Sequence, residues 1–303
     1  MSKFRLRGRR RKSHENDKDH VPIRTMVPNL ITSLAACGGI SAIAICATNY
    51  AKSLAGQPVL ASDWGNGFLA LLIACVCDAM DGRVARLLKC SSKLGAELDS
   101  LADFVNFGVA PAMFMYFWVL SGGVADGQQT ISLLVRRMML VAALFYSMCD
   151  AFRLARFNTM LEQPTLPYWK HFFLGVPAPG GCWMVLTPLL LALSLDGVKS
   201  MQFLKSAMLH PGMAIGVLIF VGVLMASRIP TVSLKALKIS RAARLPTLVV
   251  CLLLIACFAT NLWFTLGVIG AIYIATVPVV VLMFMRGKAK YLAESGASAA
   301  EGA

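Results

Sequence analysis

The chain has 303 residues, of which 57% are hydrophobic and only 15% are charged, and its mean hydropathy is +0.68. Soluble domains carry charges on about a quarter of their residues, so this composition excludes an ordinary soluble protein. Lys and Arg together number 29 against 15 Asp and Glu, so the chain has a formal net charge of +14.

The first 25 residues hold a large share of this positive charge. They contain nine Lys or Arg, including the run "RLRGRRRK", against three acidic residues. A basic arm can bind nucleic acid, but one that directly precedes a membrane span more often lies in the cytoplasm beside anionic lipid. The positive-inside rule favours the membrane interpretation, so we expect residues 1–25 to be a cytoplasmic arm without a nucleic-acid partner.

Apolar runs near the ~20 residues needed to cross a bilayer recur along the rest of the chain. They predict an all-α, polytopic membrane helical bundle of about eight transmembrane helices, in one domain that covers residues 26–286. The small and polar residues 287–303 are expected to form a disordered cytoplasmic tail. The expected spans cover about 28–48, 66–86, 98–120, 138–157, 173–194, 209–227, 246–261 and 264–285.

The connecting segments predict the orientation of these spans. Basic residues gather between the second and third spans, in "SRIPTVSLKALKISRAARL" between the sixth and seventh, and in the C-terminal "RGKAKY". On the other side, "SGGVADGQQT" and "TNLW" contain no basic residue, although other segments there do. The positive-inside rule therefore favours cytoplasmic N- and C-termini, and it places residues 77–104 at the cytoplasmic face.

Four aspartates stand at this face, where the second span ends and the third begins. Asp78 and Asp81 are three residues apart and Asp99 and Asp103 are four apart, so each pair lies on one face of its helix. The loop between them is rich in Ser, Lys and Gly, and it lets the helices return antiparallel with their acidic faces together. We therefore expect the four carboxylates to converge.

Two interpretations compete for this acidic group. An aspartate inside the membrane costs ~2.5–3.5 kcal/mol on insertion scales, which some partner must offset. A structural ion-pair cluster would interleave the two signs, whereas like charges three and four residues apart repel within each helix. Converging carboxylates fit hard divalent cations better, so a metal site is favoured. The competing ion-pair partners would be the nearby basic residues Arg83, Arg86, Lys89 and Lys93.

Small residues and a cation accompany the acids. Gly82 and Ala85 share the acidic face of their helix, and Gly95 stands four residues before Asp99. Missing side chains let a bulky group approach the backbone there. Arg86, one turn past Gly82, can hold a phosphate through two parallel hydrogen bonds. The combination suggests metal-assisted chemistry on a pyrophosphate at the membrane surface.

Together these residues form a pattern that resembles in full the signature of the CDP-alcohol phosphotransferase family. The pattern has eight fixed positions within 26 residues: Asp78-x2-Asp81-Gly82-x2-Ala85-Arg86-x8-Gly95-x3-Asp99-x3-Asp103. Further segments resemble the bacterial phosphatidylserine synthase branch of that family. These are "PNLIT", "SLADFVNFGVAPA", "FRLARFN", "GVPAP" and "SRIPTVSLK".

The resemblance implies an activity and its cofactors. The expected reaction transfers the phosphatidyl group of CDP-diacylglycerol to the hydroxyl of L-serine, which gives phosphatidylserine and CMP. The expected cofactors are two divalent cations, Mg2+ or Mn2+, which would neutralise the pyrophosphate and polarise the phosphorus under attack. Membership also implies a bacterial inner (cytoplasmic) membrane location, a lipid environment and a homodimer.

Site roles are likewise implied by the resemblance. The four aspartates Asp78, Asp81, Asp99 and Asp103 would hold the metals, and Asp103 would also be the catalytic general base for the serine hydroxyl. Asn29 and Thr32, at the cytoplasmic end of the first span, are weaker candidates for the nucleotide pocket, and Asn29 could equally cap a helix. The nucleotide and its phosphates would be received by Gly82, Ala85, Arg86 and Gly95.

The acceptor pocket is less clearly marked. Arg153 and Arg156 lie at the cytoplasmic end of the fourth span, where they can bind either a substrate carboxylate or lipid headgroups. The likeness of "FRLARFN" to the branch motif favours Arg153 as the carboxylate partner. Asn106 follows Asp103 by about one turn and can line the same pocket. Pro177 and Pro179 suggest a broken helix that serves this pocket, or a simple kink.

Two other functions remain open from the sequence. A synthase for another acceptor, such as glycerol-3-phosphate, inositol or choline, would share the eight-position signature, and only the branch motifs favour serine. A secondary transporter would also contain intramembrane acids and helices broken by proline. Its acids would tend to lie near the bilayer midplane in two related halves, whereas here they cluster at one face without a repeat.

Overall fold

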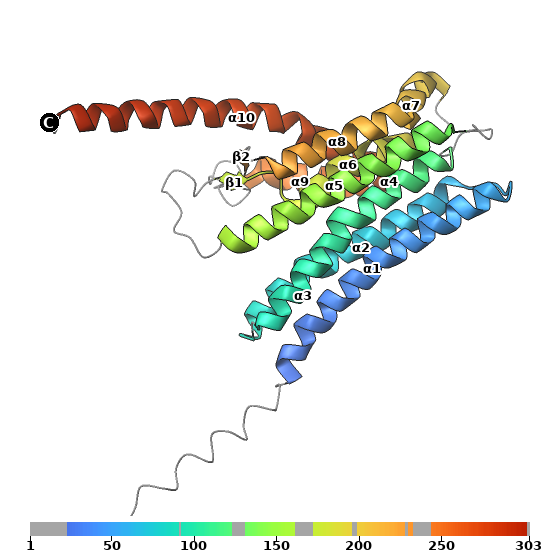
Figure 1. Cartoon of the computed structure of the whole chain (residues 1–303), viewed down its shortest axis with the longest axis horizontal. Coiled ribbons are helices and arrows are strands. Elements are labelled where there is room, and N and C mark those ends of the chain that lie inside the picture. Colours follow the sequence, from blue (N-terminus) through green and yellow to red (C-terminus); the bar gives the residue numbers. More distant parts are fainter. Residues whose placement is uncertain are drawn as a thin grey trace, which may run out of the picture.

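The structure is a computed structural model, and it describes residues 23–90, 92–122, 131–160, 172–195, 199–227, 230–232 and 244–301. Nearly all of the basic arm 1–25, most of "SGGVADGQQT" and residues 233–243 therefore lie outside the described residues. What is described is almost entirely helical (Figure 1), which confirms the all-α class.

Ten α-helices are described, together with short π, 3-10 and strand segments. Two three-residue strands pair antiparallel, with Phe172 opposite Val232 and Leu174 opposite Pro230. The elements are α1 Ile23–Leu54, α2 Ala61–Leu87, α3 Lys93–Asp103, the π-helix η1 Phe104–Val109, α4 Ala110–Leu120, α5 Leu133–Met160, β1 Phe172–Leu174, α6 Ala178–Ser194, the 3-10 helix η3 Lys199–Met201, α7 Gln202–Leu209, α8 Pro211–Ala226, β2 Pro230–Val232, α9 Arg244–Thr260 and α10 Leu262–Glu301.

A helical segment lies at each of the eight positions where a span is expected. By length and composition, four of the described segments can cross a membrane; α7 and α8, bent by 60°, are either a broken fifth span or a re-entrant loop. α6 and α9 are shorter apolar helices. The protein is therefore an integral membrane protein, while the number of eight spans stays a prediction. The four segments are Met26–Leu54, Lys93–Leu120, Leu133–Thr159 and Leu262–Leu282.

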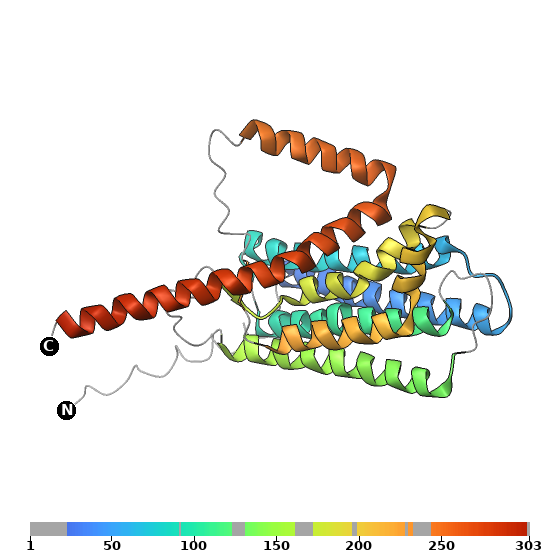
Figure 2. The ribbon, with the colours of Figure 1, turned by 90° about the horizontal axis from the view of Figure 1, so that it is seen from above.

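The bundle is organised around α4 and α6. α1 packs along α2, α5 along α8 and α6 along α10. Phe114 and Trp118 of α4 and Met184 and Leu189 of α6 are fully buried among them. α9 stands apart from these helices in Figure 2, and most of its apolar side chains are exposed, as expected for a helix that contacts lipid.

The third expected span is interrupted by the π-helix η1. The N–H of Ala110 donates to the carbonyl of Val105, five residues earlier. Proline has no N–H and its ring clashes with the carbonyl four residues before it, so Pro111 releases the carbonyl of Phe107. That carbonyl instead accepts a hydrogen bond from the hydroxyl of Tyr146 on α5, at 2.9 Å. The third span is thereby tied to the helix that carries the two candidate arginines.

Two local expectations differ from the structure. Pro177 and Pro179 do not break a helix: α6 begins at Ala178, with Pro177 as its N-cap and a proline in its first turn. Proline suits these positions because its fixed φ is helical and its missing N–H would be unpaired there anyway. α10 continues to Glu301, through the tail that was expected to be disordered. The Ala, Glu and Lys residues of that tail are strong helix formers, which explains the difference.

Candidate active site

The turn between α2 and α3 brings the acidic segments together. α2 ends at Leu87, and the chain reverses through Lys89, whose φ of 51° is left-handed. Ser92 then caps α3, because its hydroxyl accepts a hydrogen bond from the N–H of Gly95 at 3.0 Å. The cap fixes the start of α3 about two turns before Asp99. In Figure 1 this turn lies at the same end of the bundle as the first turns of α1.

Three of the four aspartates form a compact cluster. Asp78, Asp99 and Asp103 each offer a carboxylate oxygen, and these oxygens all lie within 4.8 Å of one another. Oδ1 of Asp78 is buried and has no hydrogen-bond partner among the described residues. Among the residues that the structure describes, no Lys or Arg nitrogen lies within 4.0 Å of these three carboxylates. The structure therefore does not show the alternative ion-pair cluster.

This donor set fits a divalent cation. Carboxylate oxygens are the ligands that Mg2+, Mn2+ and Ca2+ prefer. Three like charges this close repel one another unless a positive charge lies between them. A buried carboxylate oxygen without a partner is also costly, and a cation would satisfy it. The acidic cluster can thus hold a divalent metal ion.

Asp81 is not among these three carboxylates, and both of its oxygens accept hydrogen bonds. It is 3% exposed, and its Oδ2 accepts a hydrogen bond of 2.5 Å from the hydroxyl of Thr32 on α1. Its Oδ1 accepts one from the N–H of Gly82. Residues three apart on an α-helix differ by about 60° in direction, which is enough to aim Asp78 at α3 and Asp81 at α1.

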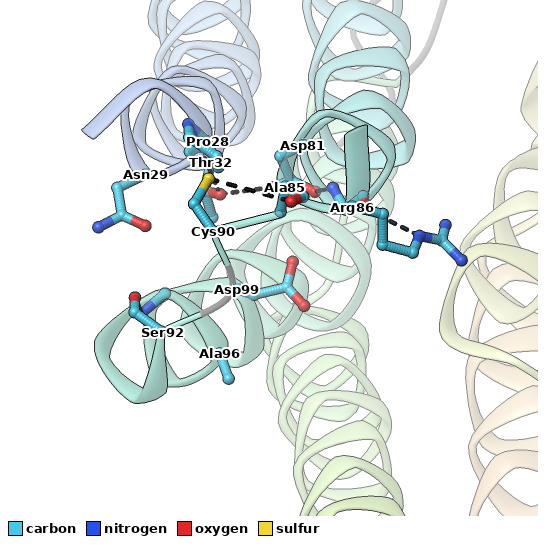
Figure 3. A pocket seen from close by; sticks show the side chains of 12 residues that line it. Pro28, Asn29, Thr32, Asp81, Ala85, Arg86, Cys90, Ser92, Ala96 and Asp99 are labelled. Carbon is cyan, nitrogen blue, oxygen red and sulfur yellow. Dashed lines mark hydrogen bonds between the residues drawn. The ribbon is translucent and has the colours of Figure 1, made fainter. Parts of the chain in front are cut away.

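A pocket of about 230 Å³ opens beside Asp81, between α1, α2 and α3 (Figure 3). All six residues that the sequence assigned to the nucleotide and its phosphates line it, together with two of the aspartates. The lining residues are Pro28, Asn29, Thr32, Asp81, Gly82, Ala85, Arg86, Cys90, Ser92, Gly95, Ala96 and Asp99.

The small residues of the pocket differ in what surrounds them. A Cβ on Gly82 would meet nothing within 4 Å, so this position faces open space. A Cβ on Gly95 would lie 2.9 Å from Oδ1 of Asn29, so this glycine lets α3 approach α1. Asn29 lies inside α1, which begins at Ile23, and it is therefore not the helix cap considered from the sequence.

Arg86 borders the pocket but does not reach into it. Its guanidinium points away from Asn29 and Asp99 in Figure 3, and its Nε donates to the carbonyl of Gly82 at 3.0 Å. The side chain is exposed and has the length to turn. Its role as a phosphate ligand stays a prediction.

The two candidate arginines of α5 have different surroundings. Arg156 donates from Nη1 to the carbonyl of Ala226 at 2.9 Å and from Nη2 to that of Ser227 at 3.1 Å. These carbonyls end α8, so Arg156 caps that helix. Arg153 is half-buried, and its Nε has no hydrogen-bond partner among the described residues. The structure thus gives Arg156 a packing role and leaves Arg153 available for a ligand.

Two buried polar residues complete the neighbourhood. Asn106 of η1 is 0% exposed, and neither end of its amide has a hydrogen-bond partner in the described chain. Its Oδ1 lies against Gly39 of α1, where a side chain would collide with it. Asp150 of α5 is also 0% exposed and was not among the residues chosen from the sequence. An ionisable residue inside an expected span is itself a functional signal, and it would have identified Asp150.

Comparison with known proteins decides the family. A model of the CDP-alcohol phosphatidyltransferase family matches residues 25–210. The chain belongs to this family. The match runs from the first turn of α1 to the end of α7 and includes every residue of the candidate site, and it confirms the resemblance seen in the sequence.

Individual relatives carry a more specific name. The chain is similar to proteins named CDP-diacylglycerol–serine O-phosphatidyltransferase from Mycobacterium leprae, Helicobacter pylori strain J99 and Bacillus subtilis. Identities are 39% over 173 residues, 35% over 216 and 37% over 139. The aligned parts cover 56%, 70% and 44% of this chain, and 48%, 74% and 68% of the respective relatives. The chain thus spans about half the length of the mycobacterial relative.

Proposed function

We propose that this protein transfers the phosphatidyl group of CDP-diacylglycerol to the hydroxyl of L-serine, producing phosphatidylserine and CMP. The observation that carries the proposal is the meeting of Asp78, Asp99 and Asp103 beside a pocket lined by the rest of the family signature. The names of the relatives support serine as the acceptor.

The acidic residues would hold the divalent cations, and Gly82 and Arg86 would receive the nucleotide and its phosphates. Asp78, Asp99 and Asp103 are the proposed ligands of a divalent cation, Mg2+ or Mn2+, and Asp81 at the edge of the pocket is the fourth proposed ligand of a two-metal site. Bound there, the cations would neutralise the pyrophosphate and stabilise the departing CMP. Gly82 would let the nucleotide approach the backbone of α2, because no atom lies within 4 Å of its missing Cβ. Arg86 would turn inward to bind a phosphate.

Asp103 would act as the general base. A carboxylate within hydrogen-bond reach takes the proton of the serine hydroxyl as its oxygen bonds to phosphorus, which is typically worth about 10²–10⁴-fold. As that bond forms, the bond from phosphorus to the CMP oxygen breaks, and CMP leaves as a phosphate monoester. Arg153, whose Nε has no partner in the described chain, would bind the serine carboxylate.

The orientation follows from the same proposal. A cytoplasmic nucleotide product requires the α2–α3 turn to face the cytoplasm of a bacterial inner membrane, and we propose that both termini lie on that side. The basic residues of the turn support this assignment through the positive-inside rule. A homodimer is proposed from family membership alone.

An acceptor panel tests the activity. Purified protein would be mixed with CDP-diacylglycerol, Mg2+ or Mn2+, and L-serine, glycerol-3-phosphate, inositol or choline, and CMP release would be measured. We expect release with L-serine only. Release with another alcohol and none with serine would replace the acceptor, and no release with any alcohol would refute the activity.

Cysteine labelling tests the orientation. In a cysteine-depleted background, Lys89→Cys should resist a membrane-impermeant thiol reagent in intact cells, while Gln57→Cys at the α1–α2 turn should react. Both positions are exposed, so accessibility from the two sides of the membrane is what the labelling compares. The reverse pattern would contradict the proposed orientation.

A further inference from the structure

α5 buries a carboxylate that the proposed reaction does not use. Asp150 is 0% exposed, and neither of its oxygens has a hydrogen-bond partner among the described residues. Its Oδ2 faces Gly108 on η1, where a Cβ would lie only 2.6 Å away. The missing side chain at Gly108 therefore makes room for this carboxylate beside the third span.

Arg153 follows Asp150 by three residues, so both lie on the same face of α5. Its charge interacts with those of Asp150 and Asp103. The two residues nevertheless do not form a closed ion pair, since no nitrogen of Arg153 lies within 4.0 Å of the Asp150 carboxylate. Opposite charges thus stand one turn apart and each has unused hydrogen-bonding capacity.

A structural ion pair would have a different geometry. Buried charges are tolerated when they are paired closely and their remaining valences are hydrogen-bonded, because desolvation otherwise exceeds the attraction. Arg156, one turn later, has the geometry of a structural arginine, because its guanidinium donates hydrogen bonds to two backbone carbonyls. The unpaired hydrogen-bonding atoms of Asp150 and Arg153 indicate a ligand that carries both a positive and a negative charge.

We propose that Asp150 and Arg153 form a zwitterion subsite for the acceptor, in which Asp150 binds the ammonium and Arg153 the carboxylate of an α-amino acid. This rests on the proposed phosphatidyl transfer. An α-amino acid carries both charges on one carbon, so a cation and an anion one helical turn apart are complementary to it. Asp150 faces Gly108 of η1, and η1 begins directly after Asp103, which links this subsite to the proposed general base.

The subsite explains how other alcohols would be rejected. An acceptor without an ammonium group would leave the buried Asp150 carboxylate unpaired, and one without a carboxylate would leave Arg153 unpaired. Sites built around a polar substrate group discriminate strongly against analogues that lack it, for this reason. Inositol supplies neither charge, and glycerol-3-phosphate and choline supply only one.

Three acceptors with a primary hydroxyl test the two halves of the subsite separately. L-serine has both charges, L-glycerate replaces the ammonium by a hydroxyl, and ethanolamine lacks the carboxylate. In Asp150→Asn, the apparent KM for L-serine should rise about 10- to 150-fold, the loss expected for one charge-assisted contact. The preference for serine over glycerate should fall by a similar factor. The KM for CDP-diacylglycerol should stay within about twofold, because that substrate has no contact with this subsite.

The complementary variant is Arg153→Ala. It should reduce the preference for serine over ethanolamine while it keeps the preference for serine over glycerate. Ser147→Ala is the matched control on the same helix, because its hydroxyl bonds to the carbonyl of Gly108 at 3.1 Å but carries no charge. We expect it to leave both preferences unchanged. Gly108→Ala tests the position of the Asp150 carboxylate, since the added methyl group would displace this carboxylate without removing its charge.

The outcomes separate this inference from the proposed function. Wild-type protein that releases no CMP with L-serine overturns both. Wild-type activity on serine together with an unchanged serine KM in Asp150→Asn overturns the subsite alone. An equal loss with all three acceptors, or with CDP-diacylglycerol as well, also overturns it, because a packing role would act on every substrate.

Discussion

The two ends of α2 are built in opposite ways. Near its start, Trp64 is fully buried and contacts Trp118 edge-to-face, with ring centroids 5.0 Å apart, and Phe114 at 5.7 Å. Near its end, Asp78 contributes to three carboxylates within 4.8 Å, with a buried oxygen that has no partner in the described chain. The first end gains stability from aromatic packing, although the buried indole N–H of Trp64 has no hydrogen-bond partner in the described chain. The second end contains repulsion between like charges. We infer that the aromatic end helps the bundle tolerate the acidic end.

The glycines of the helix repeat this contrast. A Cβ on Gly65 would lie 2.9 Å from Trp263, and one on Gly67 would lie 3.2 Å from Phe114. Gly82 has nothing within 4 Å. The same residue type thus permits close helix packing at one end and leaves space for a ligand at the other. Substitutions along α2 should therefore affect stability at its start and activity at its end.

The largest effect is expected from the acidic end. Asp78→Asn or Asp99→Asn should lower the rate of CMP release about 1,000-fold or more, because several kcal/mol of transition-state stabilisation depend on the metal. Excess EDTA should have the same effect on the wild type. Thermal stability in detergent should stay equal or rise, since a like charge is removed. Near-normal turnover in either variant would refute the metal site.

At the aromatic end the effect should appear in stability. Trp64→Ala removes a fully buried side chain and should cost about 3–5 kcal/mol of the free energy of unfolding. Folded protein should keep its KM for both substrates. Phe220→Ala on α8 is the control, because Phe220 is 54% exposed and should change stability little. A Trp64→Ala protein with wild-type stability would contradict the assigned role of the aromatic cluster.

Adding one methyl group sharpens the comparison. Gly82→Ala should raise the KM for CDP-diacylglycerol about tenfold, since overpacking costs about 1–3 kcal/mol once the ligand is bound. The free protein should gain up to about 1 kcal/mol of stability, the usual helical preference for Ala over Gly. Gly216→Ala on α8 is a matched control, because it also meets nothing within 4 Å. It should show the same gain without a change in KM, and equal kinetics for both variants would place Gly82 outside the site.

The smallest effect is expected from the arginine that caps α8. Arg156→Lys replaces the guanidinium that binds two carbonyls. It should destabilise the protein by about 1 kcal/mol, measured as a lower thermal midpoint. The KM for L-serine should not change. A selective increase in this KM would indicate that Arg156 binds the acceptor after all.

Much of the site followed from spacing alone. Intervals of three and four residues place side chains on one helix face, and a short polar loop makes two helices antiparallel, so the convergence of Asp78, Asp99 and Asp103 was predictable. The hydrogen bond from Thr32 to Asp81 was not predictable, because a 60° difference in direction decides which neighbouring helix a carboxylate contacts. The partner of Arg156 was equally hidden, since Ala226 and Ser227 are about 70 residues away in the chain.

The sequence by itself determined the class of the protein, the positions of its apolar helices and the signature that identifies its family. These depend on composition and on local periodicity, which each segment carries within itself. Only the tertiary structure decided which charges are satisfied. It sets Asp81 against Thr32, Arg156 against the end of α8, and Asp150 beside Gly108 without a hydrogen bond in the described chain. Whether a buried charge has a partner depends on the rotation and approach of helices far apart in the chain, and no local pattern encodes that.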